Sequence, residues 1–356
     1  MTGRRPRLQT LIFEVTQRCN HACRHCYNVW RGAHGEYPCG ELPTGETLAL
    51  LDKALDETRC RHVTLTGGEP LLREDLSQIL DRLQARGVRS TLISNGRLLA
   101  DESAVVDLLE RGVGLFELPL LSHRRETHDA LSGAPGAFDA VLSAMAHLRT
   151  HRGQFVAVFV ATRSNLPHLR DAIKLAFAFG ARGLMLNRFN PGGHGRNSID
   201  ELLPSVEEMA QALAVADAAA AEFGFPISCS IPFQPCLIDL DVYDHLGFGF
   251  CAAGTQRAYY TLDPLGNLRP CNHTSTILGN LREEALGDLM ASERMADFVA
   301  AHPSFCAPCR LRDVCQGGCK AAAQVCYGAL TAEEPFLRRH RDQARPLPLE
   351  DAGDPD

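Results

Sequence analysis

The number and grouping of its cysteines constrain this chain more than any other feature. It has 14 cysteines in 356 residues. That is roughly 4% of the chain, well below the about 8–10% that is typical of proteins built on disulfide bonds. A chain of this length buries a core without covalent cross-links, and its first residues do not form the apolar stretch of a secretory signal. The cysteines therefore indicate bound metal rather than disulfides.

The charge balance and the hydropathy pattern exclude two other classes of protein. The chain carries 36 Lys and Arg against 43 Asp and Glu, a net charge of −7, and its pI is near 6.1. Such a balance offers no broad basic field for a nucleic acid partner. No apolar run reaches the roughly 18 residues of a membrane-spanning helix. We therefore expect a cytoplasmic protein with neither a nucleic acid nor a membrane as its partner.

Apolar runs typical of strands alternate with amphipathic helical stretches between residues 11 and 231. The helical stretches include Asp75–Arg86 and Ser205–Phe223, each followed by a glycine. Parallel sheets built from βα units have this spacing of strands. The strand-like runs are Leu11–Val15, His62–Thr66, Ser90–Ser94, Gly114–Leu121, Phe155–Ala161 and Gly183–Phe189. Six such units predict an α/β fold, which we interpret as a partial (β/α)6 barrel; an open parallel sheet is the alternative.

The amino-acid composition of the sequence changes after Pro226. Residues 232–275 are rich in Gly, Pro, Tyr and Asn, with a short strand-like piece at Tyr259–Leu262, and residues 302–330 carry five cysteines. A segment with so few apolar residues depends on bound metal for its stability. We predict a barrel domain over residues 1–230, a small cysteine-rich domain over residues 231–345, and a disordered tail over residues 346–356.

The first cysteine group immediately follows the first predicted strand. Cys19, Cys23 and Cys26 have the spacing C-x3-C-x2-C, which places three thiolates in one tight loop. Three protein ligands on a four-iron cluster leave one iron open for chemistry. A zinc site completed by His21 or His25 is the structural alternative.

Polar groups also follow the second and third predicted strands. The second strand ends in Thr66-Gly67-Gly68-Glu69-Pro70, and the third ends in Ser94-Asn95-Gly96. Glycines at a strand end allow the backbone to approach a ligand closely. Because the carboxyl ends of parallel strands share one edge of the sheet, we expect these groups to lie near the cysteine triplet.

This combination of the cysteine triplet with GGEP resembles the radical SAM enzymes, over residues 11 to about 225. The resemblance implies that Cys19, Cys23 and Cys26 hold a [4Fe-4S] cluster whose fourth iron binds S-adenosylmethionine. It further implies that one electron cleaves this cofactor to a 5′-deoxyadenosyl radical, which abstracts hydrogen from a substrate. The residues that it places in contact with the cofactor are Gly67, Gly68, Glu69, Pro70, Ser94, Asn95 and Ser122.

The second cysteine group has a longer pattern. Cys251 and Cys271 are spaced as C-x14-G-x4-C, and four more cysteines follow as C-x2-C-x5-C-x3-C, ahead of a final Cys326. A zinc ribbon accounts for any four of these cysteines. The seven together resemble the SPASM extension of radical SAM enzymes that modify peptides. The metal ligands implied here are Cys236, Cys251, Cys271, Cys306, Cys309, Cys315, Cys319 and Cys326.

The SPASM resemblance implies two auxiliary [4Fe-4S] clusters and therefore three clusters in all. Cys306, Cys309, Cys315 and Cys326 would hold one of them. Cys251, Cys271 and Cys319 would hold the other, with Cys236 as the candidate for its fourth ligand; a buried free thiol is the alternative for Cys236. These clusters would conduct electrons away from a substrate radical.

Other residues carry weaker signals. Cys39, Cys60 and Cys229 have no partner at metal spacing, and we expect Cys60 and Cys229 to be small buried apolar groups. The loop Asn190–Arg196 follows the sixth strand and lies either beside the cofactor or in solvent. The sequence identifies no general acid or base; Glu117, Asp263 and Tyr259 are candidates only.

The resemblance favours a peptide maturase that oxidises, cross-links or rearranges a ribosomally made precursor peptide. The alternatives are protein oxidation of the kind that sulfatase maturases perform, and modification of a small molecule such as a tetrapyrrole. A non-catalytic metal-binding protein is a remote alternative, since it leaves the triplet beside GGEP unexplained. As partners we expect the precursor peptide, a separate leader-peptide-binding protein, and a reductant such as flavodoxin or ferredoxin.

Overall fold

Seven parallel strands follow one another across the sheet in chain order, and each pairs with the next. The structure is a computed structural model that describes residues 8–32 and 37–347. The strands are β1 (Thr10–Thr16), β2 (His62–Gly67), β3 (Arg89–Ile93), β4 (Val113–Pro119), β5 (Phe155–Ala161), β6 (Leu184–Arg188) and β7 (Ile227–Cys229). The six predicted strands are confirmed, with boundaries that differ by at most two residues.

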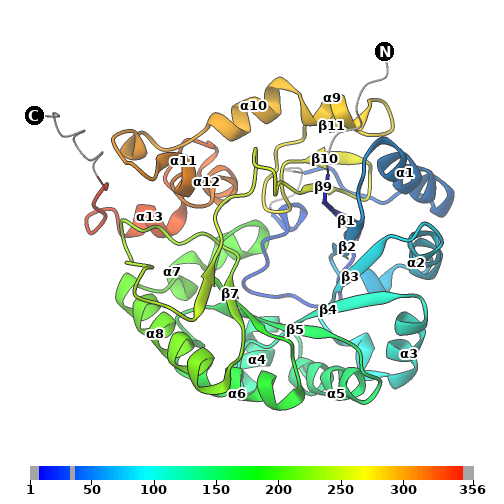
Figure 1. Cartoon of the computed structure of the whole chain (residues 1–356), viewed down its shortest axis with the longest axis horizontal. Coiled ribbons are helices and arrows are strands. Elements are labelled where there is room, and N and C mark those ends of the chain that lie inside the picture. Colours follow the sequence, from blue (N-terminus) through cyan, green and yellow to red (C-terminus); the bar gives the residue numbers. More distant parts are fainter. Residues whose placement is uncertain (1–7, 33–36, 348–356) are drawn as a thin grey trace, which may run out of the picture.

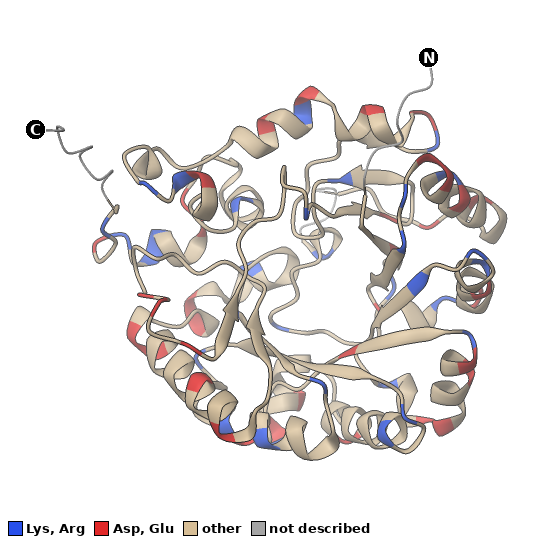
Figure 2. Cartoon of the chain, in the orientation of Figure 1, with Lys and Arg blue, Asp and Glu red and all other residues tan. Residues whose placement is uncertain are grey.

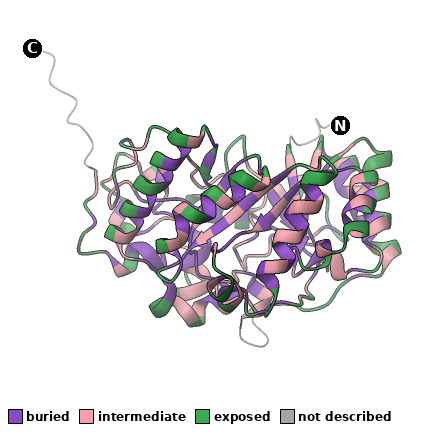
Figure 3. Cartoon of the chain, turned by 90° about the horizontal axis from the view of Figure 1, so that it is seen from below, coloured by how far each residue is buried: buried purple, intermediate pink, exposed green. Residues whose placement is uncertain are grey.

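The helices that connect these strands form an outer ring around the curved sheet (Figure 1). They are α1 (Thr44–Glu57), α2 (Leu76–Ala85), α3 (Glu102–Glu110), α4 (Arg125–Ser132), α5 (Ala137–Thr150), α6 (Leu169–Phe179), α7 (Ile199–Leu202) and α8 (Val206–Phe223). Each helix turns its buried side toward the sheet and its exposed side outward (Figure 3). In the described part of the chain, none of the helices has the length and apolar character needed to cross a membrane.

Short 3-10 helices lie in the loops between these elements. They are η1 (Val29–Arg31), η2 (Pro70–Leu72), η3 (Leu98–Ala100), η4 (Leu166–His168), η5 (Gly193–Ser198) and η6 (Ser304–Cys306). Three of them, η1, η2 and η5, directly follow segments that carry predicted site residues. The backbone after β1, β2 and β6 is therefore held in turns rather than in long open loops.

The strands alternate between two environments, as a sheet with one covered face requires. In β5, Ala157 and Phe159 have no exposed surface because they face the helices. Val156, Val158 and Val160 point to the other face and are partly accessible. The core therefore lies between the sheet and the helical ring, and the inner face of the curved sheet remains accessible.

The C-terminal region continues the same sheet at both ends. β8 (Leu246–Phe248) extends it beyond β7, and β9 (Tyr260–Leu262) pairs in parallel with β1. The antiparallel strands β10 (Asn267–Arg269) and β11 (Gly279–Asn280) follow β9. The sheet thus runs from β11 to β8 in the described residues, and these two strands form its edges. This arrangement is the predicted α/β partial barrel.

The last helices cover the side of the molecule between these two edges (Figure 1). They are α9 (Leu286–Met290), α10 (Glu293–Ala300), α11 (Arg312–Cys315), α12 (Lys320–Tyr327) and α13 (Pro335–Arg339). At one end the Glu57 carboxylate on α1 accepts a hydrogen bond of 2.6 Å from the backbone N–H of Leu286. At the other end Arg339 pairs with Asp200 on α7. The predicted domain boundaries remain predictions, and residues 348–356 of the expected tail lie outside the described residues.

Opposite charges are interspersed over the outer helices (Figure 2). Ion pairs join α1, α2 and α3 at the surface: Arg82 with Asp52, Arg86 with Asp56 and Arg111 with Asp81. Exposed pairs of this kind contribute about 0–1 kcal/mol each. They make the outer ring a solvated face and carry no sign of a ligand site.

Candidate active site

The cysteine triplet lies in the loop that leaves the C-terminal end of β1. The backbone N–H of Cys26 donates to the Cys23 carbonyl at 3.2 Å, which tightens the loop. Burial raises the pKa of the Cys23 and Cys26 thiols above the ordinary value, and the neighbouring Cys19 thiol raises both further. All three cysteines remain partly accessible. Three neighbouring thiols in one loop form a donor set that fits an iron–sulfur cluster.

The GGEP segment after β2 packs directly against the chain that leads to Cys19. The backbone N–H of Gly68 donates to the Thr16 carbonyl at 2.8 Å, and that of Glu69 donates to the Arg18 carbonyl at 2.7 Å. A Cβ atom on Gly68 would clash with the same Arg18 carbonyl oxygen. The glycine is therefore required for close approach between two loops, so that GGEP positions the cysteine loop.

The glycine-rich loop after β6 supports the other end of the cysteine loop. The backbone N–H of Gly195 donates to the Cys26 carbonyl at 2.8 Å. Gly193 has a φ of +38°, and a Cβ atom there would clash with the Asn28 carbonyl oxygen. The Nδ1 atom of His194 lies 3.3 Å from the Cys23 carbonyl. The loop thus lies against the cysteine loop rather than in solvent.

Glu69 joins the ends of β2 and β3. Its carboxylate has no exposed surface, and it accepts hydrogen bonds from the Ser94 hydroxyl at 2.9 Å and the Asn95 N–H at 2.7 Å. Burial raises its pKa to about 7, against the effect of these hydrogen bonds. Asn95 in turn donates from Nδ2 to the Asn20 side chain at 2.7 Å. The predicted cofactor residues of β2 and β3 therefore form one network with the cysteine loop.

The remaining predicted cofactor residues lie beside this network. Pro70 is buried and begins η2, and the Gly67 carbonyl accepts a hydrogen bond of 2.9 Å from Asn28. Ser122 is fully buried after β4, where its hydroxyl lies 2.8 Å from His168 and accepts from the Arg124 N–H. The Ser122 hydroxyl thus already has two partners, and its contact with the cofactor remains a prediction.

Glu117 is the one inward-facing carboxylate of β4 at this end of the barrel. It is partly accessible on the inner face, and burial alone raises its pKa to about 7. Within the described residues its side chain has neither a hydrogen bond nor an ion pair. Glu117 and Glu14 both raise the pKa of Tyr27, the residue after Cys26. An unpaired carboxylate therefore lies beside the cysteine loop.

Two other candidates from the sequence have structural roles. The Asp263 carboxylate caps the turn after β9 by accepting from the backbone N–H groups of Leu265 and Asn267, and it accepts a hydrogen bond of 2.8 Å from the Tyr37 hydroxyl. Tyr259 is half-buried near the C-terminal cysteines, and desolvation raises its pKa well above the ordinary value. The Asp263 carboxylate is engaged by three donors and is therefore not free to act as a base.

Arg269 connects the barrel to the second cysteine region, and the sequence analysis did not identify it. Its guanidinium is fully buried and pairs with Glu14 on β1. It also donates to the carbonyls of Asn272 at 3.4 Å and Thr274 at 2.9 Å, which fixes the loop after Cys271. Its only sequence signal is an arginine in a short strand directly before a cysteine.

A polar contact joins the two cysteine regions near the inner face. The Tyr27 ring stacks on His273 with centroids 4.1 Å apart, and its hydroxyl accepts from Asn272 at 2.9 Å. Asn190, after β6, donates to the Cys319 sulfur at 3.3 Å. The sequence analysis missed Tyr27, Asn272 and His273 because they are ordinary types, brought together only by the fold.

The structure groups the C-terminal cysteines differently from the expectation. Cys236, Cys306, Cys309 and Cys315 line one apolar pocket, and Cys326 does not line it. The other group holds Cys251, Cys271 and Cys319: burial raises the pKa of the Cys271 and Cys319 thiols, and the neighbouring Cys251 raises both further. The Cys326 thiol lies near Cys319 and 3.5 Å from the Pro191 carbonyl. Cys236 thus lies with Cys306, Cys309 and Cys315 in the structure, whereas the ligand set of each cluster remains a prediction.

Cys39, Cys60 and Cys229 belong to neither of the two cysteine groups. Cys60 and Cys229 are buried as predicted, with 6% and 1% of their surface exposed, whereas Cys39 is exposed. In the part of the chain that the structure describes, no three His, Cys, Asp or Glu side chains are arranged to hold a single metal ion.

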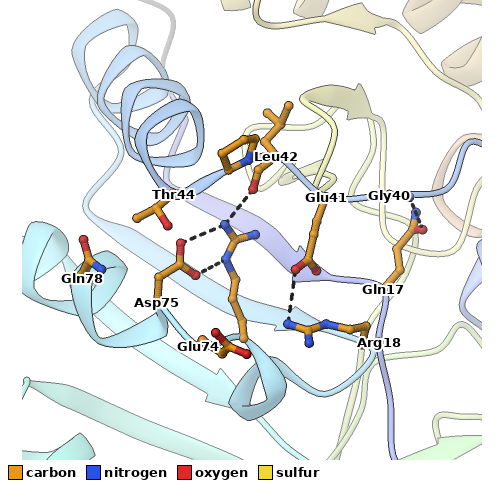
Figure 4. Close-up of a pocket in the computed structure, with 11 residues that line it drawn as sticks. Gln17, Arg18, Gly40, Glu41, Leu42, Thr44, Glu74, Asp75 and Gln78 are labelled. Carbon is orange, nitrogen blue, oxygen red and sulfur yellow. Dashed lines mark hydrogen bonds and ion pairs between the residues drawn. The ribbon is translucent and has the colours of Figure 1, made fainter.

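A wide open pocket of about 890 Å³ lies outside the barrel, between the start of α1 and the start of α2 (Figure 4). The buried Arg73 guanidinium crosses it to reach Asp75 at 2.6 Å and the Leu42 carbonyl at 3.0 Å. Arg18 and Glu41 form an ion pair at its rim. None of the predicted site residues lines it.

Comparison with known proteins agrees with this arrangement. The family model described as the radical SAM superfamily matches residues 13–176, and that of SPASM, an iron–sulfur cluster-binding domain, matches residues 251–316. The AdoMet-dependent heme synthase of Oleidesulfovibrio alaskensis is 27% identical, over 93% of this chain and 87% of that protein. The PqqA peptide cyclase of Granulibacter bethesdensis is 26% identical, over 91% of this chain and 86% of that protein.

A solved structure shares the fold. SuiB of Streptococcus suis, bound to the precursor peptide SuiA, superposes with a TM-score of 0.71 at 14% identity, over 92% of this chain and 74% of that chain. The chain is therefore a radical SAM enzyme, with a partial barrel that carries the cysteine triplet at its C-terminal edge. Within that class it belongs with the enzymes that have a C-terminal SPASM domain. These domains imply S-adenosylmethionine and iron–sulfur clusters as its cofactors.

Proposed function

We propose that this enzyme is a peptide maturase, which abstracts hydrogen from a ribosomally made precursor peptide and forms an oxidised, cross-linked or rearranged product. The observation that carries the proposal is the network at the end of β1, β2 and β3, where Glu69, Ser94 and Asn95 adjoin the cysteine loop. That network lies at the end of the barrel whose inner face carries the partly accessible Glu117.

The proposed cluster ligands are Cys19, Cys23 and Cys26. When bound there, the cluster supplies one electron that cleaves S-adenosylmethionine to a 5′-deoxyadenosyl radical. Binding requires thiolates, so the raised pKa values of Cys23 and Cys26 imply that metal binding releases protons. The GGEP and Gly193 loops hold the cysteine loop in place, and we propose that Ser94 and Asn95 contact the cofactor.

The choice of a peptide over a tetrapyrrole rests on the charge of the inner face. Relatives of nearly equal identity include both a heme synthase and a peptide cyclase, so identity alone does not decide. Haem carries propionate carboxylates, and like charges repel in a site shielded from water. The unpaired Glu117 therefore favours a substrate with a basic or hydrogen-donating group. The heme synthase relatives keep tetrapyrrole modification as the second candidate.

We also propose three [4Fe-4S] clusters, a separate leader-peptide-binding protein, and flavodoxin or ferredoxin as the reductant. The 11 cysteines outside Cys39, Cys60 and Cys229 fall into one group of three and eight further residues in the C-terminal region. Three four-iron clusters correspond to about 12 irons per chain. Protein oxidation in the manner of a sulfatase maturase remains a further alternative within the same chemistry.

The first experiment tests cofactor cleavage. The protein is reconstituted without oxygen, its iron and zinc are counted, and 5′-deoxyadenosine is measured after reduction with S-adenosylmethionine. Replacing Cys19, Cys23 and Cys26 together with Ala should abolish deoxyadenosine and leave about eight irons, those of two four-iron clusters. Cys60→Ala is the control and should retain both. Zinc in place of iron, or normal cleavage in the triple variant, would contradict the proposal.

The second experiment separates the substrate classes. Candidate precursor peptides and iron-loaded tetrapyrroles are each incubated with the reduced enzyme and S-adenosylmethionine, and products are followed by mass spectrometry. A peptide of changed mass with an unchanged tetrapyrrole is the expected result. Consumption of the tetrapyrrole with no change in any peptide would assign the enzyme to the second candidate function.

A further inference from the structure

A pocket in the C-terminal region brings together four cysteines from three separate segments. Cys306 and Cys309 lie in and after η6, Cys315 ends α11, and Cys236 comes from the segment that follows β7. All four line the same pocket. Cys306, Cys309 and Cys315 are close in sequence, whereas Cys236 is brought to them by the fold alone.

Specific contacts hold Cys236 at this pocket. Its carbonyl accepts a hydrogen bond of 3.1 Å from the Arg345 N–H, beyond α13. Two residues earlier, Gln234 donates from its side chain to Glu334, which also pairs with the buried Arg188 at 2.8 Å. The segment is therefore fixed on both sides, by a buried polar network and by the chain after α13. These contacts fix the backbone that presents the Cys236 thiol to the pocket.

The lining of the pocket fits an iron–sulfur group. Besides the four sulfurs it is mostly apolar, with Phe305, Leu311, Leu337 and Leu347 among the lining residues. Four convergent thiols with few other polar groups suit a soft metal cluster and not a hard cation.

Cys326 does not line this pocket. It lies on α12, seven residues and therefore about two turns beyond Cys319, the residue that caps the start of that helix. Its sulfur lies 3.5 Å from the Pro191 carbonyl after β6. The Cys326 thiol is therefore outside the pocket that Cys236 lines.

We propose that Cys236, and not Cys326, is the fourth protein ligand of the cluster held by Cys306, Cys309 and Cys315. The assignment rests on the proposed iron–sulfur content of the enzyme, and it reverses the expectation from cysteine spacing. In consequence one auxiliary cluster is bound by a segment between β7 and β8, so that it ties the end of the barrel to the C-terminal helices.

The test is a comparison of single substitutions in two backgrounds. One background replaces Cys306, Cys309 and Cys315 with Ala; the other replaces Cys251, Cys271 and Cys319 with Ala. Cys236→Ala is made in each and in the wild type, and iron, sulfide and the electron paramagnetic resonance of the reduced protein are measured. Cys229→Ala is the control, because Cys229 is a buried cysteine on β7 that does not line the pocket.

Cys236→Ala should lower the iron content by about one to four atoms in the wild type and in the background that keeps Cys306, Cys309 and Cys315. In the background without these three it should cause no further loss, because their cluster is already gone. Cys229→Ala should match its parent in every background. Unchanged iron and spectra in Cys236→Ala, or a further loss where the three cysteines are absent, would overturn the assignment.

A measurement on the wild-type protein tests the assignment even where a variant fails to fold. Alkylation of the holoenzyme, read by mass spectrometry, should show Cys236 protected when iron is bound and reactive after chelation. Equal reactivity in both states would overturn the assignment. Wild-type protein without iron would overturn this assignment and the proposed function together, whereas a loaded wild type that forms deoxyadenosine while Cys236 stays reactive would overturn only the assignment.

Discussion

At the residue scale, the carboxylates of Glu14, Glu69 and Glu117 differ in their partners: Glu14 and Glu69 are fully buried, and Glu117 is partly accessible. Glu14 pairs with Arg269, and Glu69 accepts hydrogen bonds from the ends of β2 and β3. Glu117 has no such partner in the described part of the chain. A buried charge without a partner costs folding free energy. A protein retains a side chain that lowers its stability in this way when the side chain binds a ligand. The unpaired Glu117 therefore agrees with the proposed preference for a substrate with a basic or hydrogen-donating group.

Glu117→Gln should stabilise the protein in a pH-dependent way. Burial raises the pKa of Glu117 from 4.5 to about 7, so the folded state keeps a proton that the unfolded state releases. The free energy of unfolding of the wild type therefore falls as the pH rises from about 4.5 to about 7, and that of the variant does not. The variant should gain on the order of 1–3 kcal/mol at pH 8 and almost nothing at pH 4.5, measured by urea unfolding.

The control for this prediction is Glu110→Gln, at the exposed end of α3. Its stability difference from wild type should stay small and nearly constant over the same pH range. If the stability difference between Glu117→Gln and wild type is equally independent of pH, then the pKa of Glu117 is not raised, and its carboxylate has a partner in the folded protein.

At the scale of secondary-structure elements, the loops after β1, β2 and β6 hold one another in place through direct contacts. Backbone hydrogen bonds join GGEP to residues 16–18 and Gly195 to Cys26. Side-chain volume at Gly68 or Gly193 would separate these loops. The geometry of the cysteine triplet is therefore set by close backbone contact between three loops.

Gly68→Ala should lower the thermal midpoint of the protein and its iron content together. The added Cβ atom meets the Arg18 carbonyl oxygen, and a backbone clash of this kind costs about 2 kcal/mol or more. Gly45→Ala is the control, since Gly45 lies in the first turn of α1 with open space around it. Ala favours helix over Gly by about 0.5–1 kcal/mol, so this variant should be slightly stabilised. Full cluster loading in Gly68→Ala would contradict the role assigned to the glycine.

Two buried ion pairs at the scale of the whole molecule connect the barrel with the C-terminal region. Arg269 on β10 pairs with Glu14 on β1, and Arg188 on β6 pairs with Glu334 before α13. Each pair has at most 1% of its side-chain surface exposed. The C-terminal region is thus held at two separate points, in addition to the strand pairing between β9 and β1.

Arg269→Met should destabilise the reconstituted enzyme by about 3–5 kcal/mol, because it leaves Glu14 buried without its partner. The double variant Glu14→Gln with Arg269→Met should recover part of that loss, since the unpaired carboxylate is then removed. Guanidinium unfolding measures both changes, and limited proteolysis follows the region after residue 231. A double variant that is as unstable as the single one would show that the arginine acts mainly through the carbonyls of Asn272 and Thr274.

Local patterns allowed much of this architecture to be predicted. The apolar runs located six strands, and the cysteine triplet with GGEP indicated the edge of the sheet where the loops meet. The partners of Cys236 and the pairing of Arg269 with Glu14 could not be predicted, because they depend on contacts between residues far apart in the chain. Spacing in sequence grouped Cys326 with Cys306, Cys309 and Cys315, but it could not indicate that Cys326 does not line the pocket of these three cysteines.

The pairing of β1 with β9 has a consequence for the order of folding. Leu11 on β1 lies opposite Tyr260 on β9, so one side of the first strand stays unpaired until most of the chain has been synthesised. Unpaired edges of apolar strands promote association between chains, and contacts of long sequence separation form slowly. A nascent chain that stalls before β9 therefore presents an open β1 edge to its neighbours, and aggregation on the ribosome competes with completion of the sheet.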